Sequence, residues 1–197
     1  IIDRNPIKNV AYFNPLVRNL PWTTFFSSRG CPGRCTFCSS PSFYGNKLRF
    51  MSPERVIAEL KYIKKIGYEE VFFRDETFTA HRQRLIEICK EMIKRKLNLT
   101  WIANARVGNV NEKLLSLMKK AGCHTIKFGV ESGSQIVLDK INKGIKIEVT
   151  EKTFNEARKA GIDTHAHLMI GCSGETKKTI GQTIRFIKKI KPTTITA

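Results

Sequence analysis

Residues 29–40 read RGCPGRCTFCSS and hold three of the chain's six cysteines. Cys31, Cys35 and Cys38 fall within eight residues, in the spacing CxxxCxxC. Four thiolates normally hold a [4Fe–4S] cluster. A set of three leaves one iron without a protein ligand, and such an open coordination position allows a metal to bind a substrate or cofactor directly. The loop therefore predicts a [4Fe–4S] site with one open iron.

Two other interpretations of these cysteines are a zinc site and three free thiols. A structural zinc site needs four ligands, and no second CxxC pair or histidine pair follows. His165 and His167 alternate along a predicted strand, and we expect them to point to opposite faces, where they could not bind one metal. The cysteine spacing favours the cluster. Gly30 and Gly33 allow the loop to wrap closely around it.

The composition is typical of a globular protein without a membrane span. The 197 residues are 41% hydrophobic, and no apolar run approaches the roughly 20 residues that cross a bilayer. The first ten residues, IIDRNPIKNV, lack the basic and then apolar layout of a signal peptide. We therefore predict a cytoplasmic chain, in which Cys89, Cys123 and Cys172 stay reduced and do not bind the cluster.

The chain is strongly basic. It has 35 Lys and Arg residues against 17 Asp and Glu residues, a formal net charge of +18. This charge is compatible with binding to nucleic acid, anionic lipid or an acidic partner domain. Most lysines, however, lie on the polar faces of predicted helices, and no basic patch is interleaved with aromatic residues. Nucleic-acid binding is therefore not favoured.

Strand and helix patterns alternate along the chain. Strands are predicted at 23–28, 69–75, 99–105, 123–132, 162–171 and 193–197. Helices are predicted at 52–67, 81–95, 111–122, 134–141, 150–160 and 176–190. Ser52 is the expected N-cap of the first helix, with Pro53 at its first position. In the last helix, Ile180, Ile184 and Ile187 are expected to face inward.

Repeated strand–helix units predict a parallel sheet covered by helices. Polar residues and one cysteine follow the strands at their carboxyl ends: Arg74, Asp75, Glu76, Asn104, Arg106, Glu131, Ser132 and Cys172. Such ends meet at one edge of the sheet, where α/β folds place their chemistry, so these side chains predict a shared pocket. The last strand would be an unprotected sheet edge, from which we infer a longer parent protein.

From residue 23 onward the sequence resembles the radical S-adenosylmethionine (SAM) superfamily, whose signature is CxxxCxxC with an aromatic residue before the last cysteine. Phe37 is that residue here. The resemblance implies a partial (β/α)6 TIM-like barrel at 23–197, truncated near the sixth strand, with 1–22 as a linker from a missing domain. It also implies that the open iron binds SAM, which is cleaved to methionine and a 5′-deoxyadenosyl radical that abstracts a substrate hydrogen.

The resemblance assigns cofactor-binding roles to residues that follow the strands. Asp75 or Glu76 would accept the methionyl ammonium, although Arg74-Asp75-Glu76 departs from the family's frequent Gly-Gly-Glu. An acidic acceptor suits an ammonium donor. Arg106 would meet the methionyl carboxylate.

Glu131 and Ser132, in the stretch GVESG, match the ribose contact of the family. A carboxylate accepts hydrogen bonds from ribose hydroxyls in other nucleotide-binding folds. Residues 171–175, GCSGE, match the turn near the adenine, where Leu-Pro would be more usual than Cys-Ser. Glu131 could instead cap the next helix, and Arg106 could instead bridge surface acids.

The motifs are most similar to the branch that carries a cobalamin-binding domain, which includes methylases of unactivated carbon and anaerobic porphyrin ring cyclases. Cobalamin is thus implied for the full-length protein, with a small-molecule substrate and an electron donor such as flavodoxin or ferredoxin. A tRNA methylthiotransferase core is the alternative enzyme, and the charge of +18 fits it. An iron–sulfur electron-transfer or structural domain is the alternative without catalysis, although an electron carrier normally uses four cysteines.

Overall fold

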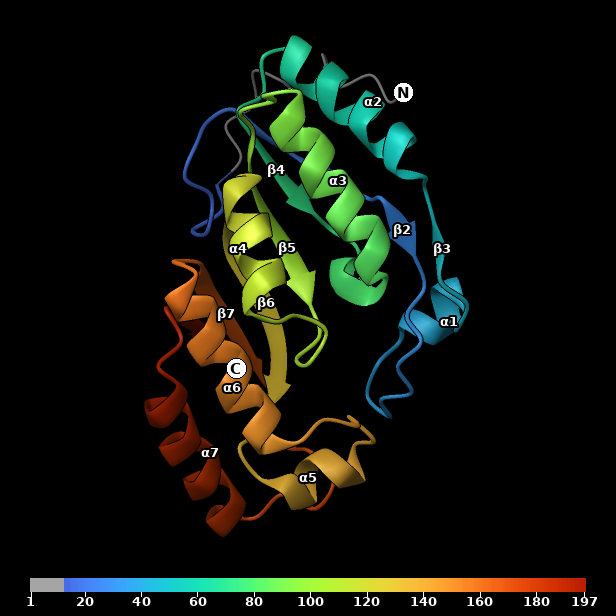
Figure 1. The fold of residues 1–197 in the computed structure, drawn as a ribbon. Helices are drawn as coiled ribbons and strands as arrows, with labels where there is room; N and C mark the ends of the chain where they lie inside the picture. The colour runs from blue at the N-terminus through green and yellow to red at the C-terminus, as the bar shows by residue number, and fades with distance from the viewer. Residues whose placement is uncertain (1–12) are drawn as a thin grey trace.

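The computed structural model describes residues 13–197, and its centre is a six-stranded parallel sheet (Figure 1). The strands lie in the order β1-β4-β5-β6-β7-β8, so that chain neighbours are sheet neighbours. Their bounds are β1 Trp22–Phe25, β4 Glu70–Phe73, β5 Thr100–Ala105, β6 Cys123–Glu131, β7 Asp163–Leu168 and β8 Thr194–Thr196. All six predicted strands are present.

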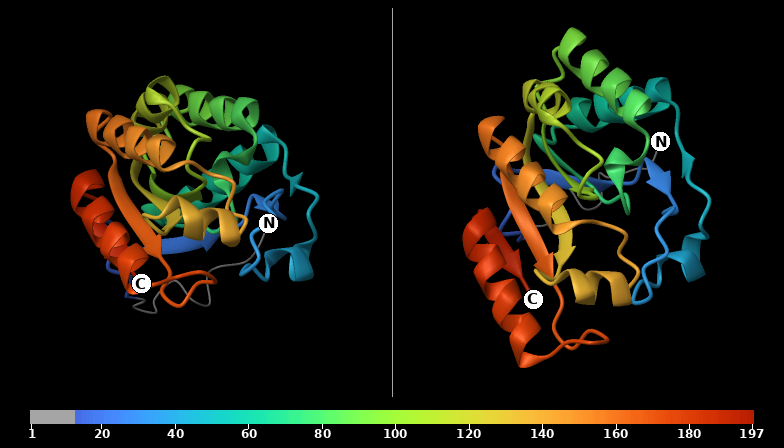
Figure 2. Two further views of the ribbon diagram at one scale, coloured as in Figure 1. Left: turned by 90° about the horizontal axis from the view of Figure 1, so that it is seen from below. Right: turned by 60° about the horizontal axis from the view of Figure 1, so that its bottom comes forward.

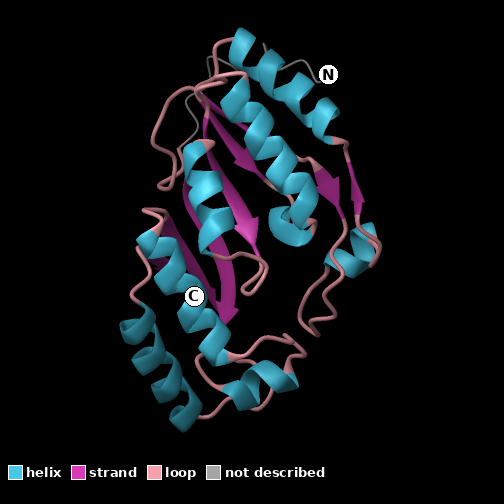
Figure 3. Ribbon diagram, viewed as in Figure 1, coloured by secondary structure: helices cyan, strands magenta, loops and turns pink. Residues whose placement is uncertain are grey.

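Helices connect the strands, and all but the short α5 cover the outer face of the sheet (Figure 3). They are α2 Pro53–Lys65, α3 Arg82–Lys94, α4 Glu112–Lys120, α5 Gln135–Lys140, α6 Ile147–Lys159 and α7 Lys177–Ile190. The sheet curves within this outer layer of helices, and α5 lies across the carboxyl ends of the strands (Figure 2). The predicted partial (β/α)6 barrel is confirmed. None of the helices within residues 13–197 is both long and apolar enough to cross a bilayer.

Each strand has one face toward the helices and one toward the barrel interior, because successive side chains alternate. Val71 and Phe73 of β4 belong to the apolar core beneath the helices. Phe72, between them, is also buried but lies outside that core. On β6, Ile126 and Phe128 pack in the same core, and Lys127 between them is only half-buried. The interior face therefore carries apolar side chains such as Phe72 as well as charged ones such as Lys127.

The ends of the first long helix follow the prediction, whereas the buried face of the last helix does not. The Ser52 side chain accepts a hydrogen bond from Arg55 N, with Pro53 at the start of α2. In α7 the predicted inward position of Ile184 is wrong, because this residue is 53% exposed. Thr179, Phe186 and Ile190 are buried instead.

Several short elements interrupt the predicted strand–helix pattern. The predicted strand at 23–28 is divided, because β1 ends at Phe25 and β2 (Ser28–Arg29) pairs instead with β3 (Arg49–Phe50) in an antiparallel hairpin. A short helix, α1 (Ser40–Tyr44), follows the cysteines, and a 3-10 turn, η2 (Phe78–Ala80), follows β4. Each lies at the end of the barrel that carries the cysteine loop.

A buried carboxylate joins the chain before β1 to the opposite, amino-terminal end of the barrel. Glu70 opens β4 and is fully buried. Its oxygens accept hydrogen bonds from Arg18 N at 3.1 Å, Asn19 N at 3.0 Å and Thr100 Oγ1 at 2.9 Å, and lie 3.0 Å from His124 Nε2. Burial opposes ionisation, but these partners and the charge of His124 hold the pKa of Glu70 below its usual range.

Replacing Glu70 by glutamine should lower the free energy of unfolding at pH 7 by about 1–3 kcal/mol, because charge-assisted hydrogen bonds are lost inside the protein. The folded-state pKa lies below the unfolded-state pKa. The contribution is therefore complete above the unfolded pKa and is lost as the pH falls through the folded one. Urea unfolding from pH 7 down to pH 3 measures both effects.

Glu69→Gln is the matched control for this experiment. Glu69 is adjacent in sequence, and its ion pair with Lys64 is partly exposed at the surface. Surface pairs contribute about 0–1 kcal/mol. An equal loss of stability in the two variants would contradict the role given to Glu70.

Candidate active site at the carboxyl ends of the strands

The three clustered cysteines lie on a loop, residues 30–39, that leaves β2 and reaches the carboxyl ends of the strands (Figure 1). Gly30 starts this loop with a φ of 91°. A Cβ at Gly30 would lie 2.3 Å from the carbonyl oxygen of Lys47, and one at Gly33 would lie 3.3 Å from Cys31 Sγ. Both predicted glycines therefore stand where the loop approaches other atoms closely.

The Asp75 carboxylate anchors the chain that leads into this loop. It is fully buried, and it accepts hydrogen bonds from Ser27 N at 2.7 Å, Ser27 Oγ at 2.7 Å and Ser28 Oγ at 2.5 Å. Arg84, also buried, donates to the oxygens of Ser27. Burial lowers the pKa of Arg84, and the charge of Asp75 counteracts this effect. Asp75 thus fixes the end of β4 against the residues before Cys31.

A second anchor comes from the segment 141–143, which follows α5. Thr36 N donates to Ile141 O at 3.0 Å, and Asn142 Nδ2 donates to Arg34 O at 2.9 Å. The next residue, Lys143, accepts a hydrogen bond from Arg106 Nη2 through its carbonyl oxygen. The cysteine loop is therefore held from both sides of the barrel mouth.

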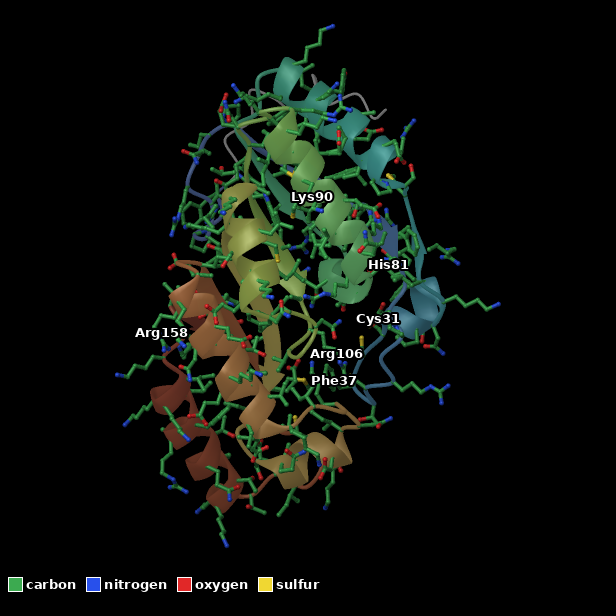
Figure 4. The ribbon with its side chains drawn as sticks, viewed as in Figure 1. Cys31, Phe37, His81, Lys90, Arg106 and Arg158 are labelled. Carbon is green, nitrogen blue, oxygen red and sulfur yellow. The ribbon has the colours of Figure 1, made fainter. Side chains whose placement is uncertain are left out.

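A cavity of about 430 Å³ lies between this loop and the strand ends. Figure 4 shows Cys31, Phe37 and Arg106 gathered there. Seven of the predicted site residues line it: Cys31, Cys35, Phe37, Cys38, Glu76, Arg106 and Glu131. A groove of about 540 Å³ lies on the outside, between α2 and α3, and none of the clustered cysteines lines it. The predicted shared pocket is thus present at the strand ends.

The three thiols line one cavity, an arrangement that is compatible with a multi-iron cluster. Cys31 and Cys35 are half-buried, Cys38 is exposed, and all three line the same cavity. Within residues 13–197, no three His, Cys, Asp or Glu side chains are grouped to hold one metal ion. Ligands of a [4Fe–4S] cluster bind separate irons and do not converge on one point. Arg106 Nη1, 3.9 Å from Cys35 Sγ, adds a positive charge beside the thiols.

Glu76 is an acid without a partner at the cavity wall. It lines the cavity, and its buried Oε2 has no hydrogen-bond partner among residues 13–197. A buried carboxylate oxygen is costly to leave unpaired, so such an atom indicates a position for an external donor. Asp75, the other predicted ammonium acceptor, points away into its hydrogen bonds with Ser27 and Ser28. The two neighbouring acids therefore have different surroundings.

Glu131 ends β6 with a φ of 63° and pairs with Lys143 at 2.6 Å, where both side chains are largely buried. Gly129 makes room for this pair, since a Cβ there would lie 2.4 Å from Glu131 Oε1. Ser132 lies outside the cavity lining and contacts Thr183 Oγ1 at 3.1 Å. Lys143 was not predicted, because one lysine in a loop has no signal that separates it from solvated lysines.

His165 and His167 lie on the same face of β7, so their predicted opposite orientation is wrong. Side chains alternate with a period of two, and residues two apart therefore share a face. Their ring centroids are 4.6 Å apart, and both rings contact threonines of β8. Burial, followed by the charge of Lys127 and then by further neighbours, lowers the pKa of His167 to about 4. This imidazole is neutral at pH 7.

The remaining three cysteines do not line the cavity. Burial raises the pKa of Cys89 to about 12 and the pKa of Cys123 well above its usual value, so both stay protonated thiols. Cys172 is buried, and burial followed by the charges of Glu175 and Glu131 raises its pKa. Thiolates, not thiols, bind metals. That Cys89, Cys123 and Cys172 are not ligands of the cluster stays a prediction.

Residues 25–187 match the sequence pattern of the Radical SAM superfamily. The chain belongs to the radical SAM superfamily. It is 38% identical, over 87% of its length, to a protein of Pyrococcus horikoshii described as an uncharacterized methyltransferase. It is 36% identical, over 84% of its length, to an anaerobic magnesium-protoporphyrin IX monomethyl ester cyclase of Rubrivivax gelatinosus. The chain spans 38% and 30% of the lengths of these two relatives.

The fold is also similar to a solved radical SAM enzyme. The radical S-adenosylmethionine methyltransferase TsrM of Kitasatospora setae matches with a TM-score of 0.82 at 20% identity. The match covers 88% of this chain and 35% of TsrM. At this identity the likeness supports the fold, and it agrees with the partial barrel of parallel strands.

Asp75→Asn should lower the free energy of unfolding by roughly 3 kcal/mol, because it removes a buried charge that attracts Arg84 and accepts hydrogen bonds from three donors. Release of residues 27–28 should also loosen the cysteine loop, so anaerobic reconstitution should yield less iron per chain than in the wild type. Urea unfolding and iron analysis measure the two effects. Glu76→Gln, one residue away, is the control and should retain wild-type values of both.

Proposed function

We propose that the chain is the catalytic barrel of a radical SAM enzyme, and that Cys31, Cys35 and Cys38 bind one [4Fe–4S] cluster. The observation that carries this proposal is the set of three thiols beside an unpartnered acid in one cavity. When bound, the cluster supplies the electron that cleaves SAM to methionine and a 5′-deoxyadenosyl radical, which abstracts hydrogen from a small-molecule substrate. The protein's part is to position the cofactor.

Glu76 is the proposed acceptor of the methionyl ammonium. Its buried Oε2 lacks a partner, whereas the Asp75 oxygens are taken by Ser27 and Ser28. An ammonium beside a carboxylate forms a strong, charge-assisted hydrogen bond. Arg106 is the proposed donor to the methionyl carboxylate, since its guanidinium has donors beyond the one that binds the carbonyl oxygen of Lys143.

Glu131 is the proposed ribose contact. Its pairing with Lys143 fixes the carboxylate at the cavity wall and leaves further lone pairs for ribose hydroxyls. Ser132 takes a supporting role in this proposal, because its hydroxyl contacts Thr183 and accepts from Ser134 N. Phe37 lies between the last two cysteines, with Lys143 Nζ 5.6 Å from its ring centroid, and would shield the cofactor from water.

The reaction of the whole protein is proposed to be a cobalamin-dependent methyl transfer or an anaerobic ring closure. Relatives described as a methyltransferase and a cyclase support this class over the methylthiotransferase and the electron carrier. TsrM has been solved with cobalamin and a [4Fe–4S] cluster bound. The same proposal includes a cytoplasmic location, the linker at 1–22 and an electron donor such as flavodoxin or ferredoxin. Residues 1–12 of that linker lie outside the described residues.

Anaerobic reconstitution should give about four irons per chain, and dithionite with SAM should then yield 5′-deoxyadenosine. Cys31→Ala, Cys35→Ala and Cys38→Ala should each abolish this product, because each removes one thiolate ligand. Chromatography of the reaction mixture and iron analysis provide the measurements. A single variant that still cleaved SAM would remove its cysteine from the ligand set.

A triple variant, Cys89→Ala, Cys123→Ala and Cys172→Ala, is the matched control. It removes the same number of thiols from outside the cavity, and it should keep wild-type iron content and SAM cleavage. Loss of about one cluster per chain in this folded variant would contradict the assignment of ligands. Circular dichroism establishes that the triple variant is folded.

Glu76→Gln should weaken SAM binding by about 1–3 kcal/mol, the scale of a hydrogen bond to a charged group. The absorption spectrum of the cluster should be unchanged, because Glu76 is not a ligand. Equilibrium dialysis with labelled SAM measures the dissociation constant. Glu87→Gln, on the outer helix α3, is the control and should bind SAM as the wild type does. An unchanged affinity in Glu76→Gln would transfer the ammonium site to another residue.

A further inference from the structure

The walls of the cavity carry more positive than negative charge. Four cationic side chains line it, and they come from different elements: Arg74, Arg106, Lys127 and Lys143. Among the described residues, two carboxylates line it, Glu76 and Glu131. Two of the cations already have oxygen acceptors, because Lys143 pairs with Glu131 and Arg106 donates to the carbonyl oxygen of Lys143.

Arg74 and Lys127 are the two cations without an acceptor. Neither makes a hydrogen bond or ion pair with any residue of the described range 13–197, and both lie over the ring of buried Phe72. The Arg74 guanidinium carbon is 4.8 Å, and Lys127 Nζ is 5.2 Å, from the ring centroid. Two cations that share one ring repel each other. Burial, and then the charge of Arg74, lowers the pKa of Lys127.

The strand register places these two cations deeper in the barrel than the proposed cofactor contacts. Lys127 precedes Glu131 by four residues on β6, and it lies beside Asn104 of β5 and His165 of β7. Its neighbours in sequence, Ile126 and Phe128, pack outward under the helices, so its own side chain takes the interior face. The neutral ring of His167 lines the same cavity.

The proposed cofactors leave this positive charge uncompensated. Glu76 would take the methionyl ammonium, Arg106 the methionyl carboxylate and Glu131 the ribose. The positive sulfonium of SAM would offset the negative charge of the cluster and its thiolates, so no carboxylate of the cofactor or of the cavity wall remains for Arg74 or Lys127. Lys127 is half-buried and Arg74 is exposed. Two positive charges held close together attract an anion, and solvent screens the half-buried charge of Lys127 less than a charge at an open surface.

We propose that Arg74 and Lys127 form a recognition site for an anionic group of the substrate, a carboxylate or a phosphate. The inference rests on the proposed function, and it names the substrate class of the same site. An anion between the two cations would relieve their repulsion. Arg offers a planar fork of donors and Lys a compact point charge, a combination that suits either anion. A substrate held there would lie beside the cofactor-binding wall.

Isothermal titration calorimetry tests this proposal with inorganic phosphate and with malonate. The chain is reconstituted anaerobically with its cluster, saturated with SAM and kept at low ionic strength. The wild type should bind at least one of the two anions in saturable fashion. Lys127→Met and Arg74→Gln should each weaken that binding at least tenfold, the effect of losing a hydrogen bond between charged groups. Lys127→Arg should restore most of it.

Lys90→Met and Arg185→Gln are matched controls that remove the same charges elsewhere. Lys90 is exposed on the outer face of α3, far from the cavity (Figure 4), and Arg185 is exposed on α7. Both should bind the anions as the wild type does. Equal weakening in the controls would show a general effect of net charge and would overturn the proposal, as would the absence of saturable binding to the wild type.

The SAM carboxylate is the other source of an anion for this site, and a second titration distinguishes it. The dissociation constant of SAM should change less than threefold in Lys127→Met and Arg74→Gln. A tenfold weakening of SAM binding in both would assign the pair to the cofactor and overturn the proposal. Formation of 5′-deoxyadenosine by the wild type is scored separately. Its absence overturns the proposed function, whereas absent anion binding with intact SAM cleavage overturns only this inference.

Discussion

The hydrogen bonds of one buried carboxylate, Asp75, determine where the chemistry of this barrel is placed. Asp75 binds the backbone and hydroxyl of Ser27 and the hydroxyl of Ser28, three residues before Cys31. The same residue follows the end of β4, so it ties the cysteine loop to the sheet edge at which Glu76 turns toward the cavity. A buried carboxylate needs such a complete set of donors. The position of the thiols relative to Glu76 therefore depends on this interaction.

The alternation of side chains along parallel strands explains why a fold of this size can hold both a core and a polar cavity. Val71, Phe73, Ile126 and Phe128 supply the apolar layer beneath the helices. Between them, Lys127 lies on the interior face, where the barrel mouth is open. The sequence pattern was sufficient to predict six strands, their parallel arrangement and the pocket at their carboxyl ends, because periodicity and chain order determine these features.

The sequence alone did not predict the detailed geometry of the site. Asp75 and Glu76 are adjacent acids, and only the donors around Asp75 distinguish a structural carboxylate from one that faces the cavity. Lys143 is brought to Glu131 by a loop whose course no local pattern predicts. The prediction of opposite faces for His165 and His167 misapplied the period of a strand, which places them together. Tertiary contacts determine the different roles of Asp75 and Glu76 and the pairing of Lys143 with Glu131. The shared face of His165 and His167, in contrast, could have been predicted from the sequence.

The effect of the net charge of +18 on anion binding depends on where the charged residues lie. Most of the 35 basic residues contribute to a field that salt screens within about 10 Å, so they affect the rate at which an anion approaches more than its affinity. Arg74 and Lys127 differ because they share the cavity with the proposed cofactor contacts and have no acceptor among the described residues. Screening is weaker at half-buried Lys127, and both side chains can donate hydrogen bonds directly to an anion in the cavity. The positive charges at the surface thus affect how fast anions approach the protein. Those inside the barrel affect which substrate groups bind.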